Sequence, residues 1–381
     1  MAEWKKRFWQ NTGSSYISMA LRLGMGVFMF RMMFQGFDGE HLGFWYLLWS
    51  LFGYGLLLDF GFGFTAQKAV AEKSATGDLQ GLNRLLATIF WTFVMIAIGI
   101  MVVFGLLSGP FIHFVLEKKE ALSAVAHRDY TLAYLVFFGG IGIMFPLGLF
   151  PEILRGRQRI DLANWVNVGT TVINFAGLYT GFKLGWSFPV MMAISVVTSV
   201  LPNIVAMFMA FRVLPGLSLK PSFFEWRAVR SQMSFSLAAY IIAFSNLLMS
   251  KTDQLVLSMT IGAFAIAIYQ AGYKMGEMLE TFAVQLQSAL SPAAADLGAR
   301  RDRAGLVELY QRSSRLTLLL ITPMYALSAA YLDPLIRLLT GMKEVTSETF
   351  WVGQFLLLAI YSSQITNSCS KRILMMSGHE K

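Results

Sequence analysis

Residues 69–82 read AVAEKSATGDLQGL, and residues 293–306 read AAADLGARRDRAGL. The two stretches lie 224 positions apart, and six of their fourteen aligned positions hold the same residue, three of them alanine. Each stretch lies between two long apolar segments, and a repeat with a fixed period indicates an internally duplicated architecture. The sequence therefore predicts a protein built from two copies of one unit.

The composition is that of a membrane protein. Hydrophobic residues make up 56% of the chain, charged residues only 14%, and the mean hydropathy is +0.56. These values exclude a water-soluble globule. A membrane-spanning helix needs about 20 mostly apolar residues, and strands of an outer-membrane barrel need about 10. Ten segments have the length of helices, which predicts an all-α polytopic bundle; they are residues 14–34, 42–64, 85–107, 132–150, 165–182, 188–211, 233–250, 255–284, 316–332 and 350–369.

The spans divide into two lobes. We expect an N-terminal lobe of six spans at residues 1–211, a linker at 212–232, and a C-terminal lobe of four visible spans at 233–381. Six is an even number, so the second copy begins on the same side of the membrane as the first. The lobes should then be parallel repeats with a substrate path between them.

The end of the second copy also has a counterpart in the first. Residues 154–158, LRGRQ, align with residues 376–380, MSGHE, at an offset of 222. Two further spans follow this turn in the first copy. We therefore expect the full protein to continue past Lys381 with two more helices.

The basic residues predict the orientation. The two ends and alternate loops carry 21 of the 31 Lys and Arg residues, whereas the opposite loops carry six. By the positive-inside rule, both ends of this chain lie in the cytoplasm. The net charge of +9 is explained by this bias and by attraction to anionic lipid headgroups, so it does not imply a nucleic acid partner.

Polar side chains within the spans are candidates for function, because a charge in the bilayer is costly unless it faces protein or water. Arg22 lies within the first span on a stripe of small and polar residues (Ser15, Ser18, Arg22, Gly26). It could contact an anion in a cavity or form an ion pair between helices. Arg31 lies near the outer surface, where snorkelling to water is the expected role.

The eighth span has the densest polar face. Gln270, Tyr273, Lys274, Glu277, Thr281 and Ser288 follow helical spacing, with Glu280 beside them. Lys274 and Glu277, at i and i+3, could neutralise each other. Alternatively, Lys274 binds an anionic substrate while Glu277 or Glu280 exchanges a proton or a sodium ion.

Two more polar positions lie near span ends. Asp59, at the inner end of the second span, is another candidate carboxylate for ion coupling, or a partner for Lys68 or Arg84. Asn246, Ser250 and Asp253 form a polar stripe for which capping the turn into the eighth span is the expected role.

Motifs of enzymes and of metal sites are absent from the sequence. It contains no Gly-rich phosphate loop before a helix and no HExxH, and the longest outer loop, residues 108–131, is short. The single cysteine, Cys369, and four scattered histidines show no metal-ligand spacing. We expect a transporter rather than an enzyme, with no cofactor other than a coupling H⁺ or Na⁺.

Four stretches carry a resemblance to a known family. They are residues 39–78 (GEHLGFWYLLWSLFGYGLLLDFGFGFTAQKAVAEKSATGD), 153–165 (ILRGRQRIDLANW), 250–277 (SKTDQLVLSMTIGAFAIAIYQAGYKMGE) and 290–302 (LSPAAADLGARRD). In this order they resemble the bacterial O-antigen type polysaccharide flippases of the multidrug/oligosaccharidyl-lipid/polysaccharide (MOP) exporter superfamily. The resemblance covers nearly the whole chain and implies a MATE-like fold of two six-helix lobes.

The resemblance also implies a substrate and a location. Proteins of this family move undecaprenyl-pyrophosphate-linked glycans across the bacterial inner membrane for O-antigen, capsule or exopolysaccharide synthesis, and their expected partners are polysaccharide polymerase and chain-length proteins. Arg suits a diphosphate because its planar group donates two parallel hydrogen bonds, and Lys acts as a point charge. We therefore assign substrate binding to Arg22, Lys274, Tyr273 and Gln270.

Two alternatives stay open. A drug exporter of the same superfamily would bind organic cations and favour acidic groups in its cavity, against which Arg22 argues. A membrane-embedded glycan polymerase or ligase would need a larger outer loop with catalytic Arg or His residues.

Overall fold

The computed structural model describes residues 2–116, 123–157, 159–225, 227, 233–288, 297 and 302–376. These residues form α-helices and two short 3₁₀ helices, with no β-strand among them. The chain divides into two compact units, Met1–Met29 with Glu40–Ala263 and Phe30–Gly39 with Phe264–Lys381. The helix α1 (Ala2–Gly36) contributes residues to both.

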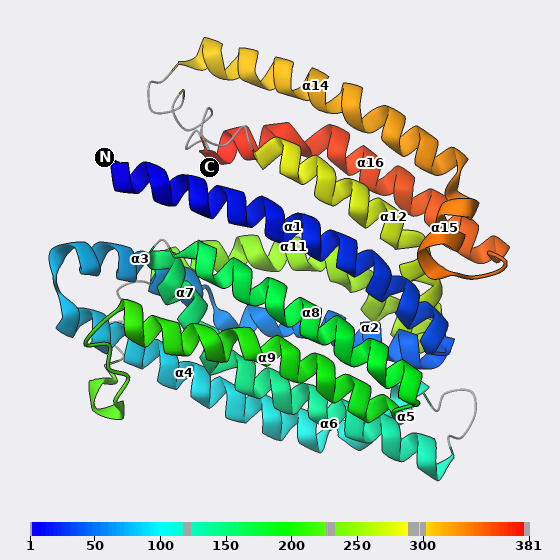
Figure 1. Ribbon diagram of the computed structural model, residues 1–381, viewed down its shortest axis with the longest axis horizontal. Coiled ribbons are helices and arrows are strands. Elements are labelled where there is room, and N and C mark those ends of the chain that lie inside the picture. The colour runs from blue at the N-terminus through cyan, green and yellow to red at the C-terminus, as the bar shows by residue number, and fades with distance from the viewer. Residues whose placement is uncertain are drawn as a thin grey trace. The chain divides into compact units, whose positions relative to one another are not determined.

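The first unit contains most of the helices. The helix α6 packs against both α4 and α9, and α8 packs on α9 (Figure 1). Two shorter helices, α3 and α7, pack on each other, and α7 also contacts α9. The bounds are α2 (Gly39–Gly55), η1 (Leu56–Asp59), α3 (Phe62–Thr76), α4 (Leu79–Leu106), α5 (Ser108–Leu116), α6 (Ala124–Leu147), α7 (Leu149–Gly156), α8 (Ile160–Leu184), α9 (Phe188–Val213), η2 (Pro221–Phe223) and α11 (Met233–Thr260).

The helices of the second unit are α12 (Ala263–Ser288), α14 (Arg303–Ala330), α15 (Leu332–Thr340) and α16 (Ser347–Met376). The first residue of α12, Ala263, belongs to the first unit. The helix α14 packs along α16, and α15 contacts both. The helices α12 and α16 approach closely where two glycines meet, since a Cβ added to Gly272 would lie 2.8 Å from Gly353 Cα. The lobe boundaries predicted at residues 211 and 233 rest on the repeat, and they stay a prediction.

The pattern of helices agrees with the duplication predicted from residues 69–82 and 293–306. The helices α4 and α14 both have 28 residues, and α5 and α15 both have nine. The helix α14 begins 224 positions after α4, and α15 begins 224 positions after α5. The same offset relates the last residue of α1 to that of α11, and the first residue of α2 to that of α12. Such agreement indicates that the two halves share a common origin.

The aspartates of the repeat have the same local role in both copies. Asp78 caps α4 by accepting a hydrogen bond from Gly81 N at 2.9 Å, and Asp302 caps α14 by accepting one from Gly305 N at 2.9 Å. Each aspartate N–H in turn bonds to the carbonyl five residues earlier. A Cβ on either glycine would lie within 2.5 Å of the capping carboxylate. The shared spacing thus reflects N-capping geometry that only glycine fits.

The second predicted span is broken, which differs from the single helix expected from the sequence. The helix α2 ends at Gly55, η1 follows, and Phe60 and Gly61 both have positive φ angles of 50° and 76°. Positive φ is costly for phenylalanine, and glycine adopts it readily. The equivalent stretch of the second copy, LETFAVQLQS at residues 279–288, contains no glycine and stays within α12.

The predicted boundary between the seventh and eighth spans was wrong. The helix α11 runs unbroken to Thr260, and the turn lies at Ile261 and Gly262, where φ is +116°. Asp253 therefore lies inside a helix and does not cap a turn. The side chains of Asn246 and Ser250 lie outside the described residues. The turn falls where glycine permits the backbone conformation.

By length and composition, four described stretches could cross a membrane: Gly39–Asp59, Leu79–Leu106, Val125–Gly156 and Phe188–Val213. A fifth is the pair α14 and α15, which is bent by 82° at its break. The other predicted spans are also helical, but polar residues such as Arg22, Asn167 and Lys274 lower their mean hydropathy.

The predicted linker packs on α4. Asn83 on α4 donates to Gly216 O at 2.9 Å and accepts from Ser218 N at 3.1 Å. Trp91 Nε1 donates to Leu219 O at 2.9 Å, and Glu225 N donates to Thr88 Oγ1 at 2.8 Å. The linker up to Glu225 is thus fixed to the first unit by its own backbone.

Candidate functional site

Five of the predicted site residues lie on α12 and belong to the second unit. Lys274 Nζ is 2.8 Å from Glu277 Oε2 and 5.2 Å from the centroid of the Phe30 ring. The two side chains therefore neutralise each other, and Lys274 also makes a cation–π contact. Gln270 is buried, and Tyr273 stacks on Tyr269 with ring centroids 5.6 Å apart.

Glu280 lies one turn further along α12 and faces α14 and α16. Its Oε1 accepts a hydrogen bond from Gln364 Nε2 at 3.4 Å. Tyr325, which is 4% exposed, lies in the same apolar cluster as Leu279 and Ala283 of α12. The Tyr325 hydroxyl is buried and has no hydrogen-bond partner in the described part of the chain. Glu280 could be predicted as a candidate from the sequence, because it lies beside the polar face of a span. Its proximity to Tyr325 depends on the packing of α12, α14 and α16.

Arg22 lies on the first-unit part of α1, and its side chain is exposed. Its Nε donates to Ser18 O at 3.3 Å, and no salt bridge to Arg22 is found among the described residues. Ser18 itself is buried, with a hydroxyl that has no described partner. Arg22 is thus exposed one helical turn after the buried Ser18, and its contact with an anion or with another helix stays a prediction.

Arg31 has a structural contact within the second unit. Its Nη1 donates to Leu338 O at 2.6 Å, in the last turn of α15. The final carbonyls of a helix have no partner within the helix, and a cation there also interacts favourably with the helix dipole. Arg31 thus caps α15, so its contact is more specific than the snorkelling expected from the sequence.

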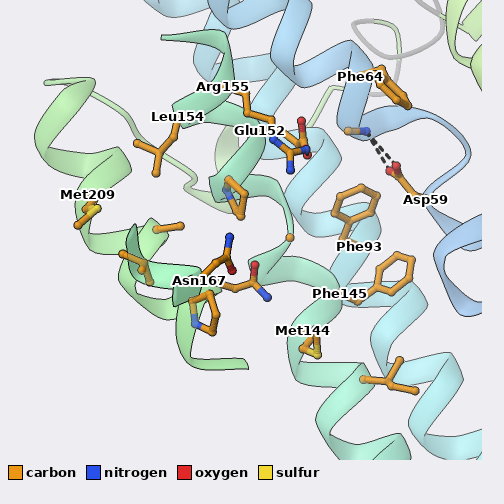
Figure 2. A pocket seen from close by; sticks show the side chains of 18 of the residues that line it. Asp59, Phe64, Phe93, Met144, Phe145, Glu152, Leu154, Arg155, Asn167 and Met209 are labelled. Atoms are coloured by element: carbon orange, nitrogen blue, oxygen red, sulfur yellow. Dashed lines mark hydrogen bonds and ion pairs between the residues drawn. The ribbon is translucent and has the colours of Figure 1, made fainter. Parts of the chain in front are cut away.

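Asp59 lies at the break between α2 and α3 in the first unit. Both its carboxylate oxygens accept from Gly63 N, at 2.9 and 3.3 Å (Figure 2). A Cβ added to Gly63 would lie 3.1 Å from Asp59 Oδ2 and 3.4 Å from Glu152 Cγ, so the two acidic side chains meet over this glycine. Glu152 pairs with Arg155 one turn along α7. The suggested partners Lys68 and Arg84 do not pair with Asp59; Lys68 lies near Glu72 and Arg84 near Glu225.

These three charged residues line one part of a cavity of about 520 Å³ that lies wholly within the first unit. In Figure 2 the rings of Phe93 and Phe145 lie on the same side of the cavity as Asp59, and Asn167 lies toward the other side. The walls are mostly apolar, with the amides of Asn167 and Asn203 as further polar groups. The lining residues are Phe52, Asp59, Gly63, Phe64, Phe93, Ile141, Met144, Phe145, Gly148, Pro151, Glu152, Leu154, Arg155, Val166, Asn167, Pro202, Asn203, Ala206 and Met209.

Glu152, Arg155 and the two asparagines were not singled out from the sequence. Arg155 was counted only as part of a basic turn that sets orientation. The sequence does contain an indication of this pair. Glu152 and Arg155, at i and i+3, follow Pro151, and prolines at 146 and 151 interrupt the apolar segment there. That signal alone would not have placed the pair beside Asp59, because the contact depends on how α3 and α7 pack.

A comparison with known proteins agrees with this architecture. The chain is similar to a multidrug resistance MATE family transporter of the MOP superfamily in its inward-facing conformation, with a TM-score of 0.67, 14% identity, and coverage of 94% of this chain and 83% of that chain. It is also similar to a MOP superfamily transporter from Pyrococcus furiosus, with a TM-score of 0.66, 13% identity, and coverage of 98% and 83%. The chain has a MATE-like fold.

Two further comparisons concern polysaccharides and lipid-linked substrates. Residues 189–345 match the family described as "Polysaccharide biosynthesis protein". The lipid II flippase MurJ, in an inward closed conformation, is similar with a TM-score of 0.61, 13% identity, and coverage of 96% of this chain and 78% of that chain. No curated protein sequence matches. The match of residues 189–345 agrees with the resemblance to polysaccharide exporters seen in the sequence, and the solved structures show a MATE-like fold. The described helices that are long and apolar enough to cross a membrane indicate a multi-pass membrane protein.

Proposed function

We propose that the MATE-like chain is a flippase that moves an undecaprenyl-pyrophosphate-linked oligosaccharide across the bacterial inner membrane. The observation that carries this proposal is the match of residues 189–345 to a polysaccharide biosynthesis family on a MATE-like fold. The glycan would serve O-antigen, capsule or exopolysaccharide synthesis. A polysaccharide polymerase and a chain-length protein are the proposed partners.

Substrate recognition is assigned to one cation in each predicted lobe. Arg22 is exposed and has no described acidic partner, so its guanidinium is available for two parallel hydrogen bonds to a pyrophosphate. Lys274 supplies a point charge, with Tyr273 and Gln270 beside it for sugar hydroxyls. Alternating access would follow from the rocking of one lobe against the other, as in other transporters with repeats.

The ion pair of Lys274 and Glu277 suggests how substrate and coupling ion compete. A pyrophosphate can bind Lys274 fully only when Glu277 no longer neutralises it. A proton or Na⁺ on Glu277 would release Lys274, and return of the free carboxylate would expel the phosphate. Glu280 and Asp59 are further candidates for the coupling carboxylate.

Reconstitution tests the function directly. The purified chain is placed in liposomes whose outer leaflet carries a lipid-linked oligosaccharide, and the glycan remaining accessible to an added glycosidase is measured with time. Protein-dependent movement of glycan to the protected leaflet supports a flippase. Formation of new glycosidic bonds would instead indicate a polymerase or ligase, and export of organic cations without glycan movement would indicate a drug exporter.

A further inference from the structure

The ammonium of Lys274 contacts two groups of different kinds among the described residues. Glu277 Oε2 lies 2.8 Å from Lys274 Nζ, and the centroid of the Phe30 ring lies 5.2 Å from the same atom. The carboxylate carries a full charge and cancels that of the lysine. The ring attracts a cation through its quadrupole and has no net charge. Phe30 therefore holds the ammonium without neutralising it.

The exposure of these side chains shows which contact can be released. The side chain of Lys274 is 21% exposed and that of Glu277 is 45% exposed. Phe30, in contrast, is 4% exposed. Water and salt screen an ion pair at an exposed carboxylate, so such a pair is weak. Glu277 can thus be neutralised or displaced while Phe30 stays against Lys274.

Neighbouring turns of α1 fix the position of the Phe30 ring. The ring of Phe34, one turn further on, has its centroid 4.6 Å from that of Phe30, and Phe34 packs against the apolar cluster of the second unit. Arg31 donates to Leu338 O of α15 at 2.6 Å. All of these residues belong to the second unit, as does Lys274. The ring is held by contacts that do not involve the ion pair.

We propose that Phe30 is a positioning residue for the anionic substrate. Its ring keeps the Lys274 ammonium in place, with its charge intact, when Glu277 is neutralised and a phosphate oxygen replaces the carboxylate. A lysine that is already ordered loses less conformational entropy when the phosphate binds. This inference rests on the proposed role of Lys274 in glycan binding, and it adds a residue on α1 that acts through that lysine.

The first test measures the hold on Lys274 without any glycan. Mono-, di- and trifluorinated phenylalanine are introduced in place of Phe30 in the full chain by stop-codon suppression. Each fluorine weakens the attraction of the ring for a cation and changes its shape little. The purified protein in nanodiscs is pulsed with acetic anhydride, and acetylation of Lys274 relative to the exposed Lys343 is measured by mass spectrometry.

A lysine that its neighbours hold firmly reacts slowly with the anhydride. In a Glu277→Gln background, we expect acetylation of Lys274 to become faster with each fluorine, by roughly three- to fivefold across the series. With Glu277 present the increase should be smaller, because the carboxylate also holds the ammonium. A merely structural role of the Phe30 ring would not follow the number of fluorines.

The matched control is the same fluorinated series in place of Phe34. This ring packs on Phe30 and makes no described cation–π contact, so the rate at Lys274 should stay constant. A rate that is independent of fluorine at Phe30, or that rises equally in the Phe34 series, would overturn the proposal.

The second test repeats the fluorinated Phe30 series in the liposome assay for glycan movement. The KM for the lipid-linked oligosaccharide should rise severalfold with the number of fluorines while kcat changes little, and an unchanged KM would overturn the positioning role. The two tests also separate this inference from the proposed function. Fluorine-dependent acetylation without glycan movement by the wild type would refute the flippase but support the hold of Phe30 on Lys274. Glycan movement with constant acetylation would refute the role of Phe30 alone.

Discussion

Arg22 is the single residue on which the proposed glycan export depends most. An arginine in a span costs about 2.5 to 3.5 kcal/mol on insertion scales. Among the described residues, the bond of its exposed side chain is to the carbonyl of Ser18 on its own helix. We expect Arg22→Ala to abolish export of lipid-linked glycan while membrane insertion stays intact or improves, measured as surface polysaccharide and as protein in the membrane fraction.

Arg22→Lys is the matched variant for this position. It keeps the charge but loses the planar donor pair, so partial export is expected. Wild-type export by Arg22→Ala would remove this residue from the mechanism.

Glu277 is the residue that decides whether Lys274 is neutralised. Glu277→Gln removes the carboxylate 2.8 Å from Lys274 Nζ and leaves the lysine permanently available. We expect glycan to bind but its movement to lose most of its dependence on an imposed proton or sodium gradient, measured in liposomes with and without the gradient. Glu308→Gln, an exposed carboxylate on α14, is the control. Unchanged gradient dependence in Glu277→Gln would rule out Glu277 as the coupling site.

At the scale of single helices, α4 and α14 share the same N-cap, formed by Asp78 and Asp302. Loss of an aspartate cap typically costs about 1 kcal/mol. We expect Asp302→Ala to lower the thermal stability of the purified chain and Asp302→Ser to restore most of it, because serine can still accept from Gly305 N. Asp78→Ala and Asp78→Ser should follow the same order, measured by thermal unfolding in detergent. A loss in one copy but not the other would show that the two caps are not equivalent.

The contribution of Asp78 to stability depends on pH. Its hydrogen bond to Lys73 Nζ, at 2.5 Å, and the bond from Gly81 N hold the pKa of Asp78 below its usual value. A lowered pKa in the folded protein means that the carboxylate stabilises the fold at neutral pH. This contribution is lost as the pH falls through the folded-state pKa. Lys73→Met should therefore lessen the loss of stability that accompanies acidification.

The bonds between α4 and the linker give a second prediction for an element. Asn83→Ala would leave Gly216 O and Ser218 N without their partner, at a cost of about 1 to 3 kcal/mol for each unsatisfied buried group. We expect the linker to detach locally and chymotrypsin to cut after Phe224, which is 41% exposed, faster than in the wild type. Gln80→Ala, an exposed amide on the same helix, should leave the cleavage rate unchanged.

For the whole molecule, orientation is the property to test. The positive-inside rule places Lys220 of the linker in the cytoplasm and Lys343, between α15 and α16, outside. In a Cys369→Ser background, Lys343→Cys should react with an impermeant maleimide in intact cells, and Lys220→Cys only after the cells are opened. The reverse labelling pattern would invert the predicted topology.

Much of the fold could be predicted from the sequence. Apolar segments of about 20 residues can satisfy their backbone hydrogen bonds in a membrane only as helices, so composition alone determined the all-α class. The 224-residue repeat predicted equivalent helices, and their matching ends agree with it. Local signals also predicted that polar residues would gather on α12, because helical spacing is periodic.

The tertiary structure decided which polar groups meet. The break at Phe60 and Gly61, the contact of Asp59 with Glu152, and Tyr325 beside Glu280 depend on how separate helices pack, and residues far apart in sequence carry no mark of that proximity. The linker's attachment to α4 likewise depends on side chains that bond a distant backbone. Periodicity thus determined the elements of this MATE-like protein, while packing determined its cavity and its charge pairs.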